Sequence, residues 1–466
     1  MDYQKEIENQ RHKVTGNNPT LNLVSPCRKN NGIYTVENKK KYISKFNSEI
    51  QELTIGAFTP ASGSGSRMFE FIYNFLQEPS SQSLSEIEKF LSNIGQFAFF
   101  KKLPTSMQKR ILDYSISLEE FASYLIEDEN LKFNDSPKGL IPFHVVEPFI
   151  LNPFQEHLLQ SKLLPSKQTL NHFTIQGKYK DRIEQAVNLL SGMTGMDFHV
   201  SYSEQNPATD SFVFDENGEV VLEKNGNSLR RPAGHGAILT NLNQIDADLI
   251  LVKNIDNIQH YHKTDLSVET WSIISGLLLE IKEEIHDFIV NGTTWEALRT
   301  WNEKYHLFHD SELTNAEKSK SIHEFLNRPI RVCGMVKNDG QPGGGPFWVE
   351  NEGIITKQIV EKAQIAQHPE QYKLMLQSTH FNPVMMALVT KDFNGEIFDL
   401  KQFIDESAYF IVEKSQAGKK VKFVELPGLW NGSMANWITL FVEIPSETFS
   451  PVKNILDLLQ PLHLAN

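Results

Sequence analysis

Residues 53–67, LTIGAFTPASGSGSR, run from an apolar segment of β-forming residues into a cluster of small residues and then an arginine. This order predicts a strand at about 53–59, a tight loop at 60–66 and the start of a helix near Arg67. Glycines let backbone N–H groups approach phosphate oxygens, and a helix start adds a partial positive charge. The stretch therefore indicates a phosphate-binding loop, although a turn made only of small residues explains it about equally well.

Two common nucleotide-binding motifs do not match this loop. No Gly-Lys-Ser/Thr sequence ends it, as a P-loop requires, and Met68 stands where the dinucleotide-binding fingerprint has its third glycine. The sequence thus argues against a P-loop kinase and against a standard NAD-dependent enzyme.

Further along the chain from the loop, β-like and helical segments alternate. Short β-like runs occur at 172–176, 197–202, 211–214, 219–223 and 248–255, and helical periodicity occurs at 180–190. Such alternation is typical of an α/β protein with a central, mixed but mostly parallel sheet.

We expect three parts: a polar N-terminal lead-in at 1–50, an α/β domain at 51–330 and a C-terminal α+β region at 331–466. Apolar residues recur at helical spacing from Phe69 onward, so a helical insertion is expected at about 70–135. Five candidate strands follow in the last part: RVCGMV, FWVENEG, AYFIVEKS, KVKFVEL and ITLFVEIP.

The composition excludes several classes of protein. The chain has 466 residues, and 45 Lys and Arg against 58 Asp and Glu give a net charge of −13, which argues against nucleic acid or an anionic membrane surface as a partner. Cys27 and Cys333 form no metal-binding pair or disulfide framework, which favours a reducing compartment. The N-terminus is charged, and no apolar run approaches the roughly 18 residues of a membrane span. We expect a cytoplasmic protein.

Three further loops carry candidate chemistry. Lys138 lies between proline and glycine in SPKGL, residues 230–237 read RRPAGHGA, and Asp256 follows the β-like run DLILVKNI. A carboxylate at the C-terminal end of a strand lies on the side that open α/β sheets use for ligands, and Mg²⁺ prefers such a carboxylate together with substrate phosphates. A lone lysine is more often simply solvated, so each loop is weak evidence by itself.

Together these loops resemble the UDP-N-acetylhexosamine pyrophosphorylases. Residues 58–68 resemble the family loop L-x-G-G-x-G-T-R-[LM], residues 137–139 its P-K-G, residues 205–208 its glutamine segment ending in Pro-Ala, and residues 232–237 its P-D-G-N-G-G turn. Residues 255–257 resemble its V-D-N, residues 360–364 its V-E-Y-S-E, and residues 448–454 its E-F-[SA]-P-L-K-N. The resemblance spans roughly 53–460, and the nearest relatives are expected to form a bacterial family of unknown function.

The resemblance implies a Rossmann-like, glycosyltransferase-A-type nucleotidyltransferase fold, a sugar 1-phosphate and a nucleoside triphosphate (UTP first) as substrates, and Mg²⁺ as cofactor. It assigns catalytic roles to Arg67, Lys138 and Lys453, nucleotide binding to Ser62, Gly63, Ser64, Gly65, Ser66, Gln205, Gly234 and His235, sugar binding to Glu361 and Asn382, and metal binding to Asp256.

This chain departs from the family pattern at several positions. Ser62 replaces a loop glycine, Ala233 the acid and His235 the asparagine of the P-D-G-N-G-G turn, and Lys362 an aromatic residue. The family has only a short loop where this chain has the helical insertion. The nucleotide and the sugar are therefore open, as is the oligomeric state.

The chemistry needs few residues. A sugar 1-phosphate is already an anion at neutral pH, so it can attack the α-phosphorus of a nucleoside triphosphate without a general base. Positioning and cationic groups lower the barrier. Two alternatives stay open: a catalytically silent protein that binds nucleotide sugars, and a glycosyltransferase that consumes them.

Overall fold

The computed structural model describes residues 3–16, 18–126, 131, 133–338, 340, 343–416 and 419–465. The chain forms two compact units, each built from segments far apart in the sequence. Unit 1 comprises Met1–Glu49, Gln205–Leu251 and Ile273–Ile444, and unit 2 comprises Ile50–Glu204, Val252–Ser272 and Pro445–Asn466. The division falls inside β11 (Leu249–Lys253) and inside α10 (Asp265–Val290).

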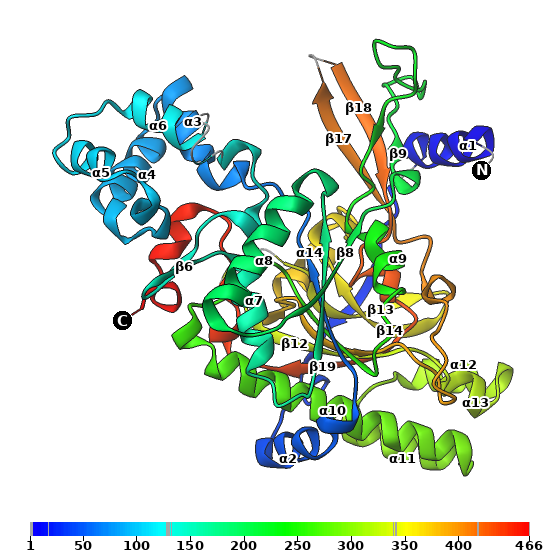
Figure 1. Ribbon diagram of the computed structural model, residues 1–466. Coiled ribbons are helices and arrows are strands. Elements are labelled where there is room, and N and C mark those ends of the chain that lie inside the picture. Colours follow the sequence, from blue (N-terminus) through cyan, green and yellow to red (C-terminus); the bar gives the residue numbers. More distant parts are fainter. Residues whose placement is uncertain are drawn as a thin grey trace. The chain divides into compact units, whose positions relative to one another are not determined.

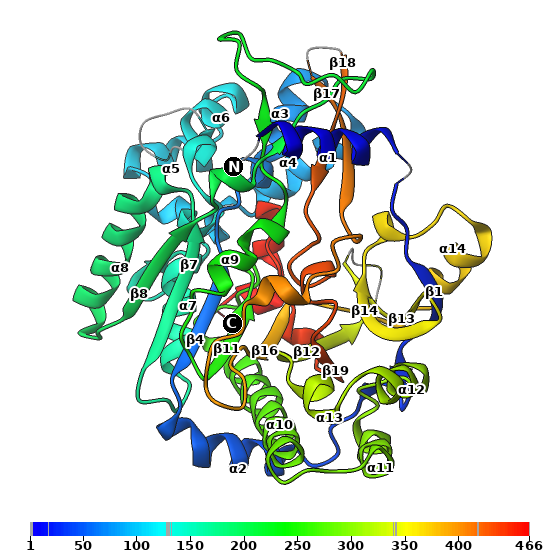
Figure 2. The same ribbon diagram turned by 90° about the vertical axis from the view of Figure 1, so that its right-hand side faces the viewer.

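Unit 2 contains three parallel strands in the order β4 (Ile55–Pro60), β7 (Thr169–Ile175) and β8 (His199–Glu204). They run side by side with α7 (Pro153–Lys162) and α8 (Lys180–Thr194) next to them (Figure 2). The helices bury Phe154, Leu158 and Ile183 in one cluster with Phe173 of β7. Most of β7 is buried, as is usual for a parallel strand covered by helices.

Between β4 and α7, the chain of unit 2 forms four α-helices, namely α3 (Glu70–Gln77), α4 (Ser81–Ser92), α5 (Thr105–Leu112) and α6 (Leu118–Ile126), which lie together (Figure 1). The expected helical insertion at about 70–135 falls on this stretch, of which residues 127–130 and 132 lie outside the described residues.

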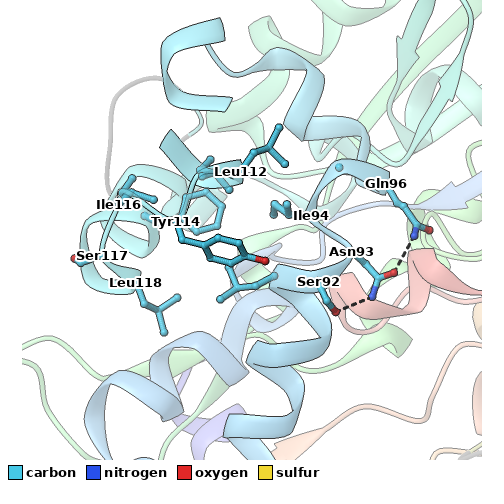
Figure 3. Close-up of a pocket in the computed structure, with 13 residues that line it drawn as sticks. Ser92, Asn93, Ile94, Gln96, Leu112, Tyr114, Ile116, Ser117 and Leu118 are labelled. Atoms are coloured by element: carbon cyan, nitrogen blue, oxygen red, sulfur yellow. Dashed lines mark hydrogen bonds between the residues drawn. The ribbon is translucent and has the colours of Figure 1, made fainter. Parts of the chain in front are cut away.

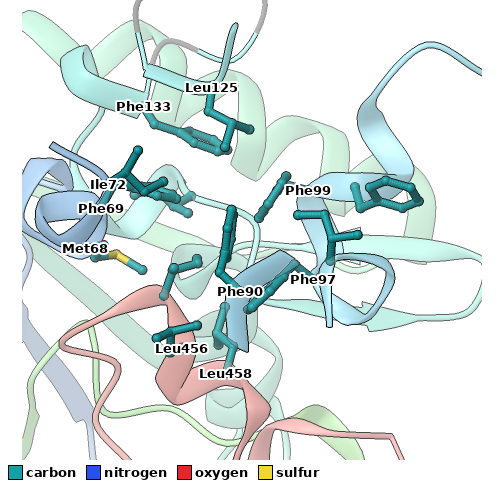
Figure 4. Close-up of a cluster of buried hydrophobic side chains, with 14 of the residues drawn as sticks. Met68, Phe69, Ile72, Phe90, Phe97, Phe99, Leu125, Phe133, Leu456 and Leu458 are labelled. Atoms are coloured by element: carbon teal, nitrogen blue, oxygen red, sulfur yellow. The ribbon is translucent and has the colours of Figure 1, made fainter. Parts of the chain in front are cut away.

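These helices enclose a core built from phenylalanine rings. The buried rings are Phe69, Phe71, Phe90, Phe97, Phe99, Phe100, Phe121, Phe133 and Phe143. Leu456 and Leu458 from the C-terminal segment lie beside Phe90 and Phe97 in the same core (Figure 4). Aromatic residues bury large apolar areas, so this core stabilises both the helices and the C-terminal segment that docks on them.

Unit 1 contains a sheet in the order β2 (Arg28–Lys29), β3 (Gly32–Tyr34), β19 (Ile438–Glu443), β12 (Ile330–Lys337) and β16 (Met385–Val389). The pairs β2–β3, β3–β19 and β19–β12 are parallel, and β12–β16 is antiparallel. With the parallel strands of unit 2, these pairs confirm the expected mixed, mostly parallel α/β architecture.

The other elements of unit 1 are antiparallel strands and further helices. Its strands are β1 (Asn22–Pro26), β9 (Ser211–Phe212), β10 (Arg230–Arg231), β13 (Gly345–Asn351), β14 (Ile354–Val360), β15 (His380–Phe381), β17 (Phe410–Gln416) and β18 (Lys419–Glu425). Its helices are α1 (Tyr3–Thr15), α2 (Lys39–Glu49), α9 (Leu239–Leu242), α11 (Trp295–Tyr305), α12 (Asp310–Ser319), α13 (Ile322–Leu326) and α14 (Pro369–Leu376). Unit 2 adds the short pair β5 (His144–Val146) and β6 (Phe149–Leu151).

One expected strand is wrong. Residues 219–223 form only isolated bridges, Phe214 with Val220 and Leu222 with Ser228, because turns at Gly218 and Gly226 with positive φ interrupt the chain on both sides. Among the described residues, none of the helices has the length and apolar character needed to cross a membrane.

Candidate functional site

Two lysines and one aspartate meet in unit 2, and we call these three residues the phosphate cluster. Lys138 Nζ donates to Asp256 Oδ2 at 2.9 Å, and Lys453 Nζ donates to the same oxygen at 2.8 Å. Lys138 Nζ also donates to the backbone carbonyl of Val452 at 3.0 Å. Segments that are far apart in the sequence thus bring three of the predicted site residues together.

The cluster carries excess positive charge next to a buried carboxylate. Burial opposes ionisation of Asp256, but the charges of Lys138 and Lys453 outweigh it and hold the pKa of this carboxyl below its usual value. The side chain of Lys138 is 13% exposed and that of Lys453 is 63% exposed. Two ammonium groups and one carboxylate leave a net charge of +1, which suits a phosphate group.

The small-residue loop lies directly against Lys138. The Lys138 N–H donates to the Gly63 carbonyl at 3.0 Å, and the Gly65 N–H donates to the Ser136 carbonyl at 3.0 Å. A Cβ at Gly65 would lie 2.5 Å from Ile141 Cδ1, so the close approach of the two segments requires glycine there.

The groups of this loop differ in whether they are already bonded within the chain. A Cβ at Gly63 would meet no atom within 4 Å. The Ser66 N–H is bonded to Ser64 Oγ at 3.2 Å, and Ser62 accepts a bond from Gln176 Nε2 at 2.6 Å through its carbonyl. Arg67 lies in the 3₁₀ turn Ser66–Phe69, is exposed, and forms no ion pair with the described residues. The amides of Gly65 and Ser66 are thus already used within the chain, whereas the guanidinium of Arg67 is available to an anion.

Asp256 lies just after the end of β11, where backbone hydrogen bonds hold the chain. The Ile255 N–H donates to the carbonyl of Pro60, at the C-terminal end of β4, and the Val452 N–H donates to the Asp256 carbonyl at 3.0 Å. The carboxyl ends of parallel strands are where α/β proteins bind ligands. Asp256 therefore lies near the end of a strand, as expected, and beside the loop that follows β4.

Unit 1 groups three of the other predicted residues. His235 accepts a bond from the Leu429 N–H at Nδ1, 2.8 Å away, and its Nε2 lies 3.8 Å from Oε1 of Glu361. The His235 ring stacks on Trp430, with centroids 4.4 Å apart. Gly234 has φ +75°, and a Cβ there would lie 2.8 Å from an oxygen of Glu425, so glycine is required.

Glu425 is a neighbour of this group that the sequence analysis does not assign. Burial raises its pKa, and so does the charge of Glu361, while the charge of His235 lowers it. Asn382 is linked to Glu361 through Gly344. The Asn382 N–H donates to the Gly344 carbonyl at 2.8 Å, and a Cβ at Gly344 would lie 3.5 Å from Glu361 Cγ. The Asn382 Nδ2 is buried and has no hydrogen-bond partner among the described residues.

Gln205 does not join this group. Its side chain donates to Asp210 Oδ1 at 3.3 Å, and no hydrogen bond of the described residues links it to His235 or Glu361. It lies just before the 3₁₀ turn Pro207–Thr209.

Sequence reasoning missed a set of buried polar residues in unit 2. Glu156, His144, His463 and Ser450 are hydrogen-bonded in series. His144 and His463 are 319 positions apart, so no spacing in the sequence could have joined them.

Few side chains at this site could coordinate a metal ion. Among the residues that the structure describes, no group of three or more His, Cys, Asp or Glu side chains could hold a metal. Both lysines bind Oδ2 of Asp256, and its Oδ1 accepts no hydrogen bond from the described residues. A single free carboxylate oxygen fits a Mg²⁺ ion that takes its other ligands from substrate phosphates and water.

A hollow of about 360 Å³ lies in the helical part of unit 2 (Figure 3). Its lining residues are Leu91, Ser92, Asn93, Ile94, Gly95, Gln96, Ile111, Leu112, Tyr114, Ile116, Ser117, Leu118 and Phe121. None of these carries a charge at neutral pH, so this hollow does not suit a phosphate.

Comparison with known proteins places the chain in a family. A family model described as "Domain of unknown function (DUF4301)" matches residues 2–464. The chain belongs to the DUF4301 family. This confirms the expectation of a family without an assigned function. No curated protein matches the sequence of this DUF4301 protein.

Solved structures with a similar fold are sugar-nucleotide enzymes. The uridine diphosphate N-acetylglucosamine pyrophosphorylase from Trypanosoma brucei has a TM-score of 0.50 and 12% identity, with 97% of the DUF4301 chain and 72% of that chain covered. A putative UDP-N-acetylglucosamine pyrophosphorylase from Entamoeba histolytica has a TM-score of 0.46 and 14% identity, with 91% and 82% covered. The first likeness supports the expected nucleotidyltransferase fold for the DUF4301 protein.

Proposed function

We propose that this DUF4301 protein is a Mg²⁺-dependent nucleotidyltransferase. It joins a nucleoside triphosphate, UTP in the first instance, to a hexose or N-acetylhexosamine 1-phosphate and releases pyrophosphate. The observation that carries the proposal is the shared contact of Lys138 and Lys453 with one oxygen of Asp256. The fold similarity to a uridine diphosphate N-acetylglucosamine pyrophosphorylase supports it.

Unit 2 supplies the groups for phosphate transfer. The attacking oxygen of the sugar phosphate forms a bond to the α-phosphorus, and the bond from that phosphorus to the pyrophosphate oxygen breaks. No proton has to be removed from the nucleophile, so the absence of a base at the cluster is no obstacle. Lys138, Lys453 and Arg67 would hold the phosphates in line and stabilise the charge on the leaving pyrophosphate.

The free oxygen of Asp256 would hold Mg²⁺ together with substrate phosphates. A bound Mg²⁺ ion neutralises phosphate charge and supports the departure of pyrophosphate. Two lysines on the neighbouring oxygen keep Asp256 ionised, which a metal ligand requires.

Two residues of unit 1, Glu361 and Asn382, are the ones that we assign to the sugar. Glu361 can accept hydrogen bonds from sugar hydroxyls, and the unpartnered Nδ2 of Asn382 can donate one. We assign Gly234, His235 and Gln205 to the nucleotide. Because His235 stands where the pyrophosphorylase turn has asparagine, the base of the nucleotide has to be identified by experiment.

The test is to incubate the purified protein with Mg²⁺, each of the four common nucleoside triphosphates and a panel of sugar 1-phosphates, and to measure pyrophosphate. Release that requires both substrates supports the proposal and names the pair. Asp256→Asn is the matched negative control. If no pyrophosphate is released but a nucleotide sugar binds, the protein is a binding protein. If a nucleotide sugar is consumed without release of pyrophosphate, the protein is a glycosyltransferase.

A further inference from the structure

Lys453 reaches the phosphate cluster because its backbone is held, not because its side chain is packed. Its side chain is 63% exposed, whereas Ser450 and Val452 are fully buried. Val452 is bonded at both ends: its N–H donates to Asp256, and its carbonyl accepts from Lys138. The direction of Lys453 therefore depends on whatever fixes residues 450–453.

A series of buried hydrogen bonds connects this segment to α7. Ser450 Oγ lies 2.7 Å from His463 Nε2, and His463 Nδ1 lies 2.9 Å from His144 Nε2. His144 Nδ1 lies 2.7 Å from Oε1 of Glu156, a residue of α7. Each of the four side chains is at most 4% exposed. We call Glu156, His144, His463 and Ser450 the buried chain.

The protonation of these groups gives the chain one direction. Burial lowers the pKa of His144 and His463 to about 3 and raises the pKa of Glu156 to about 8. At neutral pH both imidazoles are then neutral and Glu156 is protonated, so each imidazole offers one donor and one acceptor. With protonated Glu156 as the donor to His144 Nδ1, the remaining order follows: His144 Nε2 donates to His463 Nδ1, and His463 Nε2 donates to Ser450 Oγ.

Ser450 is held by its backbone as well as by its hydroxyl. Its N–H donates to Asn257 Oδ1 at 2.9 Å, directly beside Asp256. The Lys453 N–H donates to Asp457 Oδ2 at 2.7 Å. An apolar core could fill the same space, but hydrogen bonds are directional and hold the segment in one orientation.

We propose that the buried chain positions Lys453: it couples the segment 450–453 to α7 and so sets where the ammonium group meets a phosphate. Its four members are positioning residues that touch no substrate. The role of Lys453 in this inference rests on the proposed function, but the anchoring of the segment can be measured without turnover.

The first experiment measures amide hydrogen exchange in the full chain, followed by mass spectrometry of peptides from 445–458. We expect Ser450→Ala to speed exchange at Val452 and Lys453 at least tenfold. Thr448→Val is the matched control, because Thr448 is equally buried two residues before Ser450 but its hydroxyl donates only to the nearby Pro445 carbonyl. It should change those rates less than twofold. Equal effects of the two variants would overturn the proposal.

A second pair of variants tests the direction of the chain and does not depend on Ser450→Ala folding. Glu156→Gln retains an N–H donor for His144 and should keep exchange within twofold of wild type, whereas Glu156→Leu should speed it at least tenfold. Fast exchange in both variants would refute the protonated, donating Glu156. Slow exchange in both would refute the coupling to α7.

The third measurement is a double-mutant cycle on pyrophosphate release. Ser450→Ala should lower kcat about tenfold with KM changed less than threefold, and should cause no further loss in a Lys453→Ala background. A further tenfold loss there would show that the chain does not act through Lys453. If wild type releases no pyrophosphate, the proposed function fails, and the exchange results alone decide the anchoring.

Discussion

The ammonium nitrogen of Lys453 lies 2.8 Å from Oδ2 of Asp256, although 197 positions separate the two residues in the sequence. This contact ties the C-terminal segment of unit 2 to the loop that follows β11. It also makes one carboxylate the common partner of two lysines from different segments.

Removing the shared carboxylate should abolish turnover. In Asp256→Ala the two lysines lose their common partner and the metal loses its protein ligand, so pyrophosphate release should fall below detection while the fold is retained. Circular dichroism and thermal unfolding check the fold. Wild-type activity in this variant would remove Asp256 from the site.

The two lysines should each matter for the chemical step. Lys138→Ala and Lys453→Ala should each lower kcat by about 100-fold or more, because each removes a positive charge from the transferring phosphates. Steady-state kinetics of pyrophosphate release measures the effect. Lys180→Ala, at an exposed lysine of α8 in the same unit, serves as the control and should leave kcat unchanged. Similar losses in all three variants would contradict a specific role.

Two glycines of the small-residue loop at 60–66 should respond differently to substitution by alanine. Gly65→Ala should lower the free energy of unfolding by about 1–3 kcal/mol, because the added Cβ meets Ile141 Cδ1 at 2.5 Å and the Ser136 carbonyl at 2.9 Å. Gly63→Ala meets no protein atom within 4 Å and should leave stability unchanged. If phosphate lies over Gly63, that variant should still weaken binding of the triphosphate about tenfold, as calorimetric titration would detect. Unchanged affinity would place the phosphate elsewhere.

Glu361 should discriminate between the two substrates. Glu361→Gln keeps the size of the side chain but weakens its acceptance of sugar hydroxyls, so the KM for the sugar 1-phosphate should rise about tenfold. The KM for the triphosphate should change less than twofold. Glu370→Gln, at an exposed glutamate in α14, is the control. An equal rise in both KM values in Glu361→Gln would argue against a sugar contact.

The buried histidines of unit 2 should make the protein sensitive to acid. Burial lowers the pKa of His144, His157 and His463 to about 3. Their contribution to stability is complete above the unfolded value of about 6.5 and is lost as the pH falls towards 3. Glu156, with its pKa raised to about 8, acts in the opposite direction, because its contribution grows as the pH falls from 8 towards 4.5.

Near pH 5.5 these four groups should together contribute an uptake of about two protons on unfolding, three for the histidines less one for Glu156, which is about 2–3 kcal/mol of the stability lost per pH unit. Urea denaturation between pH 5 and 6 measures this slope. His463→Gln should reduce it by about one proton. A slope that is the same in the variant would contradict a neutral, buried His463.

Local patterns in the sequence predicted the elements around the phosphate loop well. The strand expected at 53–59 is β4 (Ile55–Pro60), and the run at 248–255 contains β11 (Leu249–Lys253), because apolar β-forming residues with turn residues at their ends leave few alternatives. The run at 219–223 has the same local character, but glycine turns on both sides keep it from pairing as a strand. The strand β16, MMALV, was not expected, because periodicity does not distinguish a short, continuously apolar strand from a segment of a buried helix.

By itself the sequence determined the α/β class, the loop at 60–66 and the residue types that can bind phosphate, because these follow from local periodicity and side-chain chemistry. The meeting of Lys138, Lys453 and Asp256 at one oxygen was decided only by the tertiary structure, as was the series from Glu156 to Ser450. Such contacts depend on how strands and helices from distant segments pack. Burial then sets the charge of each group, and no spacing along the chain records it.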